Sequence, residues 1–370
     1  MLDAASTIRN RLINRSLELL RIPSITGDEA AIAKHLYKWA KAQKQLSADD
    51  ITKHGNALVI GHPDTRRPCI ALVGHLDTVP PTPADASPKI NGNLIIGRGA
   101  SDMKGAIAIM QVIVETNNLA MLPFALVLVL YDREEGHCRN NGLQPLLENY
   151  EPLSAIDLAI CMEPTDNYLQ LGCMGAISAR ITFSGRSAHS ARPWQGENAI
   201  YKSVPILQKL LEQKPHEVKI AGLSFYEVMS ITMAKGGSSH NTIPANFELN
   251  LNYRFAPTTP IQIANKNAIQ KIKNLIANSA TIEILDVAPP GPIPNDNLIL
   301  NQIQQTINLK IGPKQAWTDV ARLSAFGIDA VNLGPGAQAQ AHQAGESVSI
   351  DALVKSYEIL MKILHNPLIN

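Results

Sequence analysis

Three short, almost continuously apolar runs constrain the fold of this chain more than any other feature. They cover residues 70–73, 124–131 and 158–162. A strand that is apolar along its whole length must be covered on both faces, which is typical of parallel sheets flanked by helices. Residues 103–115, between the first two runs, are apolar on nearly all sides and predict a buried helix. This order of strand, helix and strand predicts an α/β fold with a mostly parallel central sheet.

A different pattern begins at about residue 174. Apolar and polar residues alternate over residues 177–184 and again over 247–255, which predicts strands with one exposed face. Further strands are expected at residues 227–233 and 281–287, and amphipathic helices at residues 199–213 and 261–278. The resulting order βαββαβ predicts a small ferredoxin-like α+β domain.

The first pattern returns after a segment rich in Pro and Gly. Residues 288–294 predict a hinge, and a helix at 297–307 and a strand at 330–333 follow it. We therefore expect two domains, in agreement with the roughly 150 residues of a typical domain. The larger domain would comprise residues 1–174 and 290–370, with residues 175–289 inserted as the smaller domain.

The balance of charges disfavours two classes of partner. Lys and Arg total 33 against 32 Asp and Glu, without a long run of like charges, so we expect no binding to nucleic acid or to a membrane surface. The sequence has no signal-peptide core and no apolar stretch of the ~18 residues that a transmembrane helix needs, which predicts a cytoplasmic protein. The four cysteines form no C-x-x-C pair, so we expect reduced thiols rather than a disulfide framework or a Cys-ligated zinc.

Histidine and carboxylate side chains follow the predicted strands at the point where each strand ends. Open α/β sheets bind ligands at the carboxyl ends of their strands. Histidine at both flanks with carboxylates between them is the donor set of a two-metal hydrolytic site. The residues concerned are His75, Asp77, Asp102, Glu134, Glu135, Glu163 and His342.

Each of these signals also has an ordinary structural explanation. Asp77 could accept the second ring proton of His75, as a partner that orients a ligating imidazole, but polar residues at a strand end also serve solubility alone. Asp102 follows a Gly-rich stretch and precedes the predicted helix, where Asp is a common N-cap. Glu134 and Glu135 are adjacent in a loop, where most such pairs are merely solvated. Several such residues at successive strand ends together favour a metal site.

Seven stretches, taken in order along nearly the whole chain, resemble one family. They are residues 74–80, 97–105, 132–136, 162–165, 185–193, 241–245 and 341–346. The family is that of the dinuclear-zinc amidohydrolases, which includes succinyl-diaminopimelate desuccinylase, acetylornithine deacetylase, aminoacylase and glutamate carboxypeptidases. The resemblance implies a zinc-hydrolase catalytic domain and an inserted lid domain that also serves in dimerisation.

The resemblance also implies which strand-end residues are metal ligands and which is the general base. His75 and Glu163 would hold one Zn²⁺, Glu135 and His342 the other, and Asp102 would bridge them, with a cis peptide bond after it. Glu134 would be the general base. Co²⁺ or Mn²⁺ could occupy the same N and O ligands.

The matching lid positions imply contacts with the substrate. His189 would reach the active site of a neighbouring subunit and steady the tetrahedral oxyanion, which requires a homodimer joined through the lids. Asn241 and Arg254 match positions that contact the substrate, although Arg254 could equally be an outward-facing strand residue. A guanidinium suits a carboxylate because it can bind in a bidentate manner.

Within the family, the chain most resembles the actinobacterial type of desuccinylase. This implies hydrolysis of N-succinyl-LL-2,6-diaminopimelate to succinate and LL-2,6-diaminopimelate, a step toward lysine and diaminopimelate. Residues 173–174 and 316–319 depart from the pattern of the better-known desuccinylases, so Thr318, Arg192 and Arg322 are the candidates for binding the succinyl carboxylate. The alternatives are an acetylornithine deacetylase, a dipeptidase or aminoacylase, and a catalytically silent binding protein.

Overall fold

The chain forms two compact units. The computed structural model describes residues 2–63, 66–83, 85, 87–258 and 260–368. The larger unit extends as far as Gly172 and also includes Ile293–Gly312 and the chain from Thr318 onward. The smaller unit comprises Cys173–Pro292 and Pro313–Trp317, so it interrupts the larger unit in sequence.

The return of Pro313–Trp317 to the smaller unit is a difference from the predicted boundaries, 175–289 and 290–370. The backbone N–H of Met174 approaches the carbonyl oxygens of Lys314 and Ala316 at 3.3 and 3.2 Å. Gln315 exchanges side-chain hydrogen bonds with the backbone of Tyr226. These contacts tie the segment to Met174 and Tyr226 of the smaller unit, which no local pattern in the sequence indicates.

The larger unit is built on a sheet with parallel central strands. Among the described residues its order is β1 (Ile51–His54), β2 (Ala57–Ile60), β6 (Ala125–Tyr131), β3 (Cys69–His75), β7 (Leu158–Cys161), β17 (Ala330–Asn332), β8 (Leu169–Leu171) and β16 (Ile311–Pro313). Neighbours from β6 to β17 are parallel, whereas β1, β2 and β8 pair antiparallel at the edges. The predicted α/β class with a mostly parallel central sheet is confirmed.

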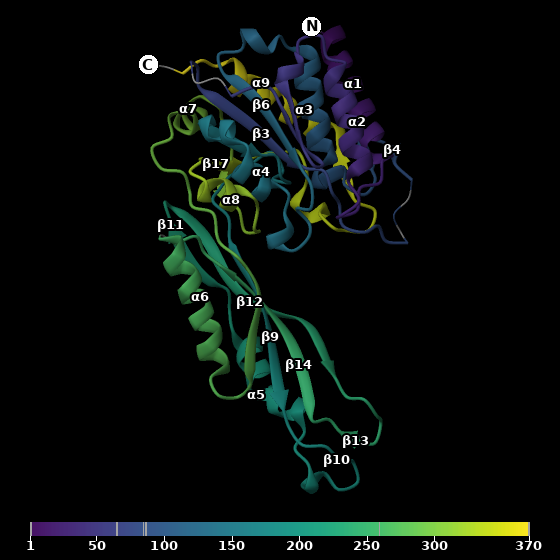
Figure 1. Cartoon of the computed structure of the whole chain (residues 1–370), viewed down its shortest axis with the longest axis vertical. Coiled ribbons are helices and arrows are strands. Elements are labelled where there is room, and N and C mark those ends of the chain that lie inside the picture. The colour runs from purple at the N-terminus through teal and green to yellow at the C-terminus, as the bar shows by residue number, and fades with distance from the viewer. Residues whose placement is uncertain (1, 64–65, 84, 86, 259, 369–370) are drawn as a thin grey trace. The chain divides into compact units, whose positions relative to one another are not determined.

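Helices cover both faces of this sheet (Figure 1). They are α1 (Leu2–Leu20), α2 (Ala30–Lys41), α3 (Gly105–Thr116), α4 (Leu143–Asn149), α7 (Leu298–Thr306), α8 (Val320–Ala325) and α9 (Ile350–His365). Strands β3 and β6 are buried at every position, as their continuous apolar runs require. Helix α3 is buried from Gly105 to Val114 and contacts α1, α9 and β3, so the expected buried helix is present. The larger unit also contains a small sheet, which contacts α1 and α9. Its strands are β18 (Ser347–Ser349), β5 (Leu94–Ile96) and β4 (Lys89–Asn91).

The smaller unit is an antiparallel sheet packed against two helices. The strand order is β11 (His216–Ile220), β12 (Leu223–Gly236), β14 (Asn246–Phe255), β9 (Gly175–Ser184) and β15 (Thr281–Ala288), and the helices are α5 (Ala199–Glu212) and α6 (Ile261–Ile276). Alternate residues of β9, Ile177 to Phe183, are buried against apolar residues of both helices. With β11 and the separate two-stranded sheet of Ala188–His189 and Thr242–Ile243 set aside, the chain order βαββαβ and the sheet order 4-1-3-2 are those of a ferredoxin-like domain, as predicted.

In the part of the chain that the structure describes, no helix combines the length and apolar character needed to cross a membrane.

Candidate metal centre

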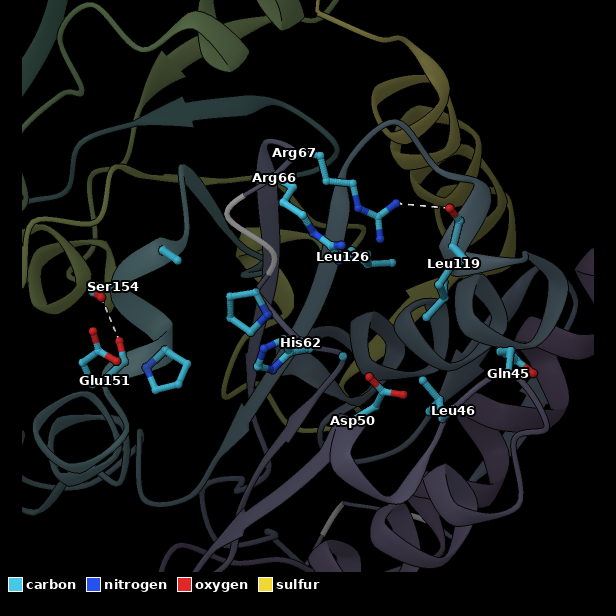
Figure 2. A pocket seen from close by; sticks show the side chains of 15 residues that line it. Gln45, Leu46, Asp50, His62, Arg66, Arg67, Leu119, Leu126, Glu151 and Ser154 are labelled. Atoms are coloured by element: carbon cyan, nitrogen blue, oxygen red, sulfur yellow. Dashed lines mark hydrogen bonds between the residues drawn. The ribbon is translucent and has the colours of Figure 1, made fainter.

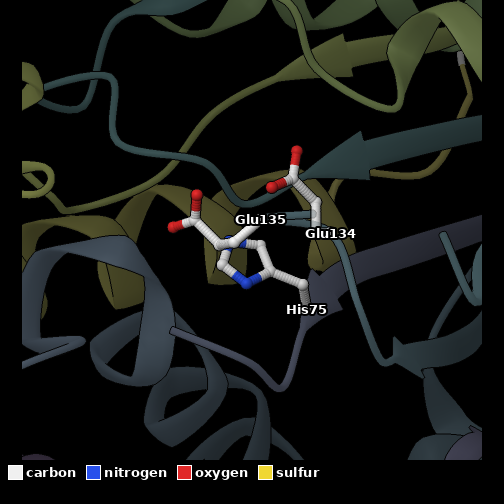
Figure 3. Close-up of side chains that lie close together, drawn as sticks. All are labelled: His75, Glu134 and Glu135. Carbon is white, nitrogen blue, oxygen red and sulfur yellow. The ribbon is translucent and has the colours of Figure 1, made fainter. Parts of the chain in front are cut away.

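The strand ends that carry the candidate ligands lie level with one another. His75 of β3 pairs with Tyr131 of β6, and Val73 pairs with Cys161 of β7. The loops after β6 and β7 therefore leave the sheet beside the imidazole of His75. The side chains at this edge are those of His75, Glu134, Glu135 and Glu163. Figure 3 shows the two neighbouring Glu carboxylates extending to the same side of the His75 ring.

Asp102 lies between the two candidate histidines. One carboxylate oxygen is 3.1 Å from Nε2 of His75, and the other is 3.7 Å from Nε2 of His342. Oε1 of Glu135 is 2.8 Å from the same nitrogen of His342. The peptide bond after Asp102 is cis, as the family resemblance implied.

Ligand atoms within 4.8 Å of one another form three groups among the described residues. They are His75, Asp102 and Glu163; Asp102, Glu135 and His342; and His75, Glu134 and Glu135. The first two groups share Asp102, so they could hold two cations that have this carboxylate in common.

The donor set fits divalent metal ions. All candidate ligand atoms are imidazole nitrogens or carboxylate oxygens, which suit Zn²⁺, Co²⁺ and Mn²⁺. Four carboxylates converge on only two imidazoles, and most of these side chains are shielded from solvent. Such an excess of buried negative charge is costly unless cations balance it.

The same crowding changes the acidity of the site. Burial opposes a charged imidazole at His75, but the hydrogen bond to Asp102 and the nearby Asp77 carboxylate outweigh it and raise the pKa of His75 well above 6.5. Loss of hydration, together with the charge of Glu163, raises the pKa of Glu134 well above 4.5 despite the opposing effect of His75. The hydrogen bond to Glu135 raises the pKa of His342. In the metal-free site, burial and neighbouring charges thus favour the protonated forms of these three groups.

Asp77 lies beside His75, as predicted for a partner residue, and also makes contacts that were not predicted. Nδ1 of His75 donates to the backbone carbonyl oxygen of Asp77 at 3.0 Å, whereas the Asp77 carboxylate is 3.6 Å from that nitrogen. The carboxylate also accepts the backbone N–H groups of Glu134 and Glu135 at 2.9 and 3.0 Å, and the hydroxyl of Thr26 at 2.9 Å. Asp77 is fully buried, so its carboxylate anchors the loop that carries both Glu residues. Sequence reasoning missed Thr26, because no local motif marks it.

Arg322, a predicted substrate contact, makes several hydrogen bonds within the fold. Its Nε donates to Asp319 at 2.8 Å, Nη1 donates to Gln144 at 2.6 Å, and Nη2 donates to the carbonyl oxygen of Cys138 at 2.9 Å. Each guanidinium nitrogen is thus engaged, and the residue is 9% exposed. Thr318, the neighbouring candidate, is buried.

The remaining substrate candidates belong to the smaller unit. His189 lies in the short strand β10 (Ala188–His189), which pairs with β13 (Thr242–Ile243). The next residue along, Ser190, donates its N–H to the carbonyl oxygen of Asn241, so His189 and Asn241 lie in one loop region. Arg192 is exposed and donates its N–H to the carbonyl oxygen of His189. Arg254 of β14 is partly buried, and its Nε donates to Asn252 at 3.1 Å.

A cavity of about 840 Å³ lies at the other edge of the sheet (Figure 2). Its lining residues precede β3, β6 or β7 in the sequence, except Leu126, which lies near the start of β6. His75, Glu134, Glu135 and Glu163 lie at or beyond the carboxyl ends of the same strands. Both basic and acidic side chains line it, and Arg67 donates to the carbonyl oxygens of Ala120 and Leu122. It contains none of the predicted site residues.

The chain matches one family model and several named proteins over most of its length. The model of peptidase family M20/M25/M40 matches residues 71–366. The succinyl-diaminopimelate desuccinylase of Corynebacterium glutamicum is 31% identical over 94% of this chain and 94% of its own. A Mycobacterium tuberculosis protein that carries the same name provisionally is 33% identical over 96% of this chain and 99% of its own.

Solved structures share the fold at low sequence identity. A metallo-carboxypeptidase of the M20 family from Sulfolobus solfataricus has a TM-score of 0.74 at 16% identity, covering 96% of this chain and 98% of that chain. A tripeptidase from Staphylococcus aureus has a TM-score of 0.73 at 20% identity with the same coverage. With a family match that extends over most of its residues, this chain belongs to peptidase family M20/M25/M40.

Proposed function

We propose that this protein is a metal-dependent amide hydrolase that converts N-succinyl-LL-2,6-diaminopimelate and water to succinate and LL-2,6-diaminopimelate. The observation that carries the chemistry is the pair of ligand groups that share Asp102, with Glu134 beside them. Similarity to the C. glutamicum desuccinylase over nearly the whole chain supports the choice of substrate. The reaction would serve lysine and diaminopimelate biosynthesis.

Two Zn²⁺ ions are the proposed cofactors, with Co²⁺ as a possible substitute. His75, Asp102 and Glu163 would hold one ion, and Asp102, Glu135 and His342 the other. Bound in this way, the ions would lower the pKa of a water molecule toward ~7 and polarise the amide carbonyl group.

Glu134 is the proposed general base. It belongs to one of the three ligand-atom groups, with His75 and Glu135, but is not needed in either group that shares Asp102. Its carboxylate would take a proton from the attacking water as the new C–O bond forms. The same carboxylate would return that proton to the amine nitrogen as the C–N bond breaks.

The smaller unit is the proposed source of substrate contacts and of a homodimer. His189 would steady the oxyanion of a partner subunit, and Asn241 and Arg254 would contact the substrate. Exposed apolar side chains on and near α5 support a protein contact there, since Trp194, Tyr201 and Leu211 are 75%, 73% and 86% exposed.

The succinyl carboxylate requires a cationic partner that a neutral acetyl group does not. Because Arg322 is already engaged by Asp319, Gln144 and Cys138, Arg254 and Arg192 are the stronger candidates. Replacing either arginine should reduce turnover of the succinyl substrate more than turnover of an acetyl substrate.

The deciding experiment compares amide hydrolysis of N-succinyl-diaminopimelate, N-acetylornithine and a dipeptide by the full-length, metal-loaded protein. A chelator-treated sample is the control, and bound metal is measured in both. Chelator-sensitive turnover that favours the succinyl substrate supports the proposal. Preference for another substrate would be consistent with the proposed mechanism but would contradict the proposed pathway. Two bound metals without turnover of any amide would indicate a binding protein.

A further inference from the structure

Glu346 is a buried carboxylate to which the two-metal mechanism gives no role. It lies on the loop that carries His342, yet most of its contacts are with the loop that carries Asp102. We propose that Glu346 is a positioning residue that holds Asp102 and His342 at the separation needed for the second metal ion. This inference rests on the two-metal site of the proposed function.

The Asp102 loop is wrapped around the Glu346 carboxylate. Oε1 accepts the backbone N–H groups of Ser101 and Asp102 at 2.8 and 2.9 Å, and Oε2 accepts that of Gly99 at 3.0 Å. Glu346 is 1% exposed. One of these bonds is made by the backbone of Asp102 itself, so movement of the carboxylate would displace the proposed bridging ligand directly.

Strand pairing brings the two loops together at the same place. Strand β5 leads into the Asp102 loop, β18 follows the His342 loop, and the two pair with Ser347 opposite Ile96. One residue beyond this pair, Gly97 donates its N–H to the carbonyl oxygen of Glu346 at 2.9 Å. The hydrogen bonds of the Glu346 side chain therefore continue the contact between the two loops from the β5–β18 pair as far as Asp102.

Arg98 balances the buried charge and ties it to a third segment. Its Nη1 is 3.2 Å from Oε2 of Glu346, and its Nη2 is 2.7 Å from Oδ2 of Asp85. The other oxygen of Asp85 accepts the N–H of Gly345 at 3.0 Å. The backbone before Glu346 and the side chain of Glu346 are thus held by one network, and a paired, hydrogen-bonded carboxylate tolerates burial.

A second close approach fixes the other side of the Asp102 loop. A Cβ atom at Gly336 would lie 2.2 Å from the carbonyl oxygen of Ser101, so only Gly fits there. The Ser101 hydroxyl donates to the carbonyl oxygen of Ala337 at 3.1 Å. The segment between β17 and β18 therefore contacts the Asp102 loop twice, near its start through Gly336 and Ala337 and at its end through Glu346. Of these two contacts, only the one through Glu346 involves a charged side chain.

Loss of this carboxylate should affect the two metal sites unequally. His75 and Glu163 leave strands that the central sheet holds in place, whereas His342 lies ten residues beyond the end of β17, in a loop. Glu346→Gln leaves a single acceptor oxygen for three backbone N–H groups and turns an amide donor toward other donors. The site that contains His342 should weaken more than the site that contains His75.

The test is a Co²⁺ titration of the metal-free, full-length protein. Calorimetry and the visible absorption of bound Co²⁺ monitor the titration. We expect two equivalents in the wild type. In Glu346→Gln the second equivalent should bind about 10–100-fold more weakly, with an altered absorption band, while the first should weaken less. Asp351→Asn is the matched control, because Asp351 also pairs with an arginine, Arg9, but is exposed and contacts neither metal loop.

Glu346→Asp is a second test that can be used if Glu346→Gln does not fold. It keeps the charge but is one methylene shorter, so it cannot reach all three N–H groups, and the second equivalent should again weaken. Wild-type affinity and absorption for both equivalents in either folded variant would overturn the inference even if activity fell. A wild-type protein that binds fewer than two metal ions would instead refute the proposed function.

Discussion

Replacement of Asp77 by Asn tests whether its carboxylate positions the Glu134–Glu135 loop. The carboxylate accepts three hydrogen bonds, two from the backbone of Glu134 and Glu135 and one from the Thr26 hydroxyl. An Asn side chain keeps one acceptor oxygen and turns an NH₂ group toward the other donors. The Thr26 hydroxyl can rotate and accept instead, but a backbone N–H cannot.

The magnitude follows from the one backbone donor that loses its acceptor. A buried donor left unsatisfied costs about 1–3 kcal/mol, so we expect Asp77→Asn to lower the free energy of unfolding of the metal-free protein by that amount. The released N–H belongs to Glu134 or Glu135, the proposed base or a proposed metal ligand. We therefore expect kcat/KM to fall by about 10–100-fold, as is typical when a partner that orients metal ligands is lost.

Thermal and denaturant unfolding of the metal-free protein measure the first effect, and steady-state hydrolysis of the succinyl substrate measures the second. Asp157→Asn is the matched control. Asp157 accepts the N–H of Cys69 at 2.7 Å, at the opposite end of β3 from His75. It should lower stability with little change in kcat/KM.

The outcome that contradicts this reasoning is a similar stability loss in both variants with kcat/KM of Asp77→Asn within about threefold of wild type. The Asp77 carboxylate would then stabilise the fold without positioning the two Glu residues. If Asp77→Asn lost bound metal but kept normal stability, Asp77 would act by orienting His75 rather than by positioning the two Glu residues.

Three further predictions can be checked with the same protein. Glu134→Gln should keep its bound metal, by elemental analysis, and lose about 10²–10⁴-fold in kcat; near-normal turnover would show that another group is the base. Gly175→Ala should lower the free energy of unfolding by about 1–3 kcal/mol, because its Cβ would lie 2.3 Å from the buried ring of Phe255; an unchanged melting temperature would contradict this. Burial opposes ionisation of Asp85, but hydrogen bonds from two backbone N–H groups and Arg98 outweigh it and lower its pKa from 3.8 to about 2. A lowered pKa stabilises the fold above the unfolded-state value, so the stability difference between wild type and Asp85→Asn should be full above about pH 5 and shrink as the pH falls toward 2; a difference independent of pH would refute it.

Much of the fold could be read from local patterns. The continuous apolar runs predicted strands covered on both faces, and β3 and β6 are buried at every position. Alternation over residues 177–184 predicted a strand with one buried face, and β9 has that pattern. These features are legible because the period of burial along a chain follows directly from the geometry of each element.

The neighbourhood of the candidate ligands could also be expected from sequence, because parallel strands bring their carboxyl ends to one edge. The placement of His75, Glu134, Glu135 and Glu163 at that edge needed only the strand assignments. Their roles as ligands or base stay a proposal that the metal and kinetic experiments test.

Only the tertiary structure decided which side chains pair across long separations. The Asp77 carboxylate was expected at His75 and lies 3.6 Å from Nδ1 of that residue, but it also accepts N–H groups 57 and 58 residues along the chain. No sequence pattern indicated that Arg322 donates hydrogen bonds to Asp319, Gln144 and Cys138, and its contact with the substrate stays a prediction. Glu346 reaches Asp102 across 244 residues. Periodicity specifies which face of an element is buried, whereas these pairings depend on where separate loops meet once the elements have packed, and no local pattern records that meeting point.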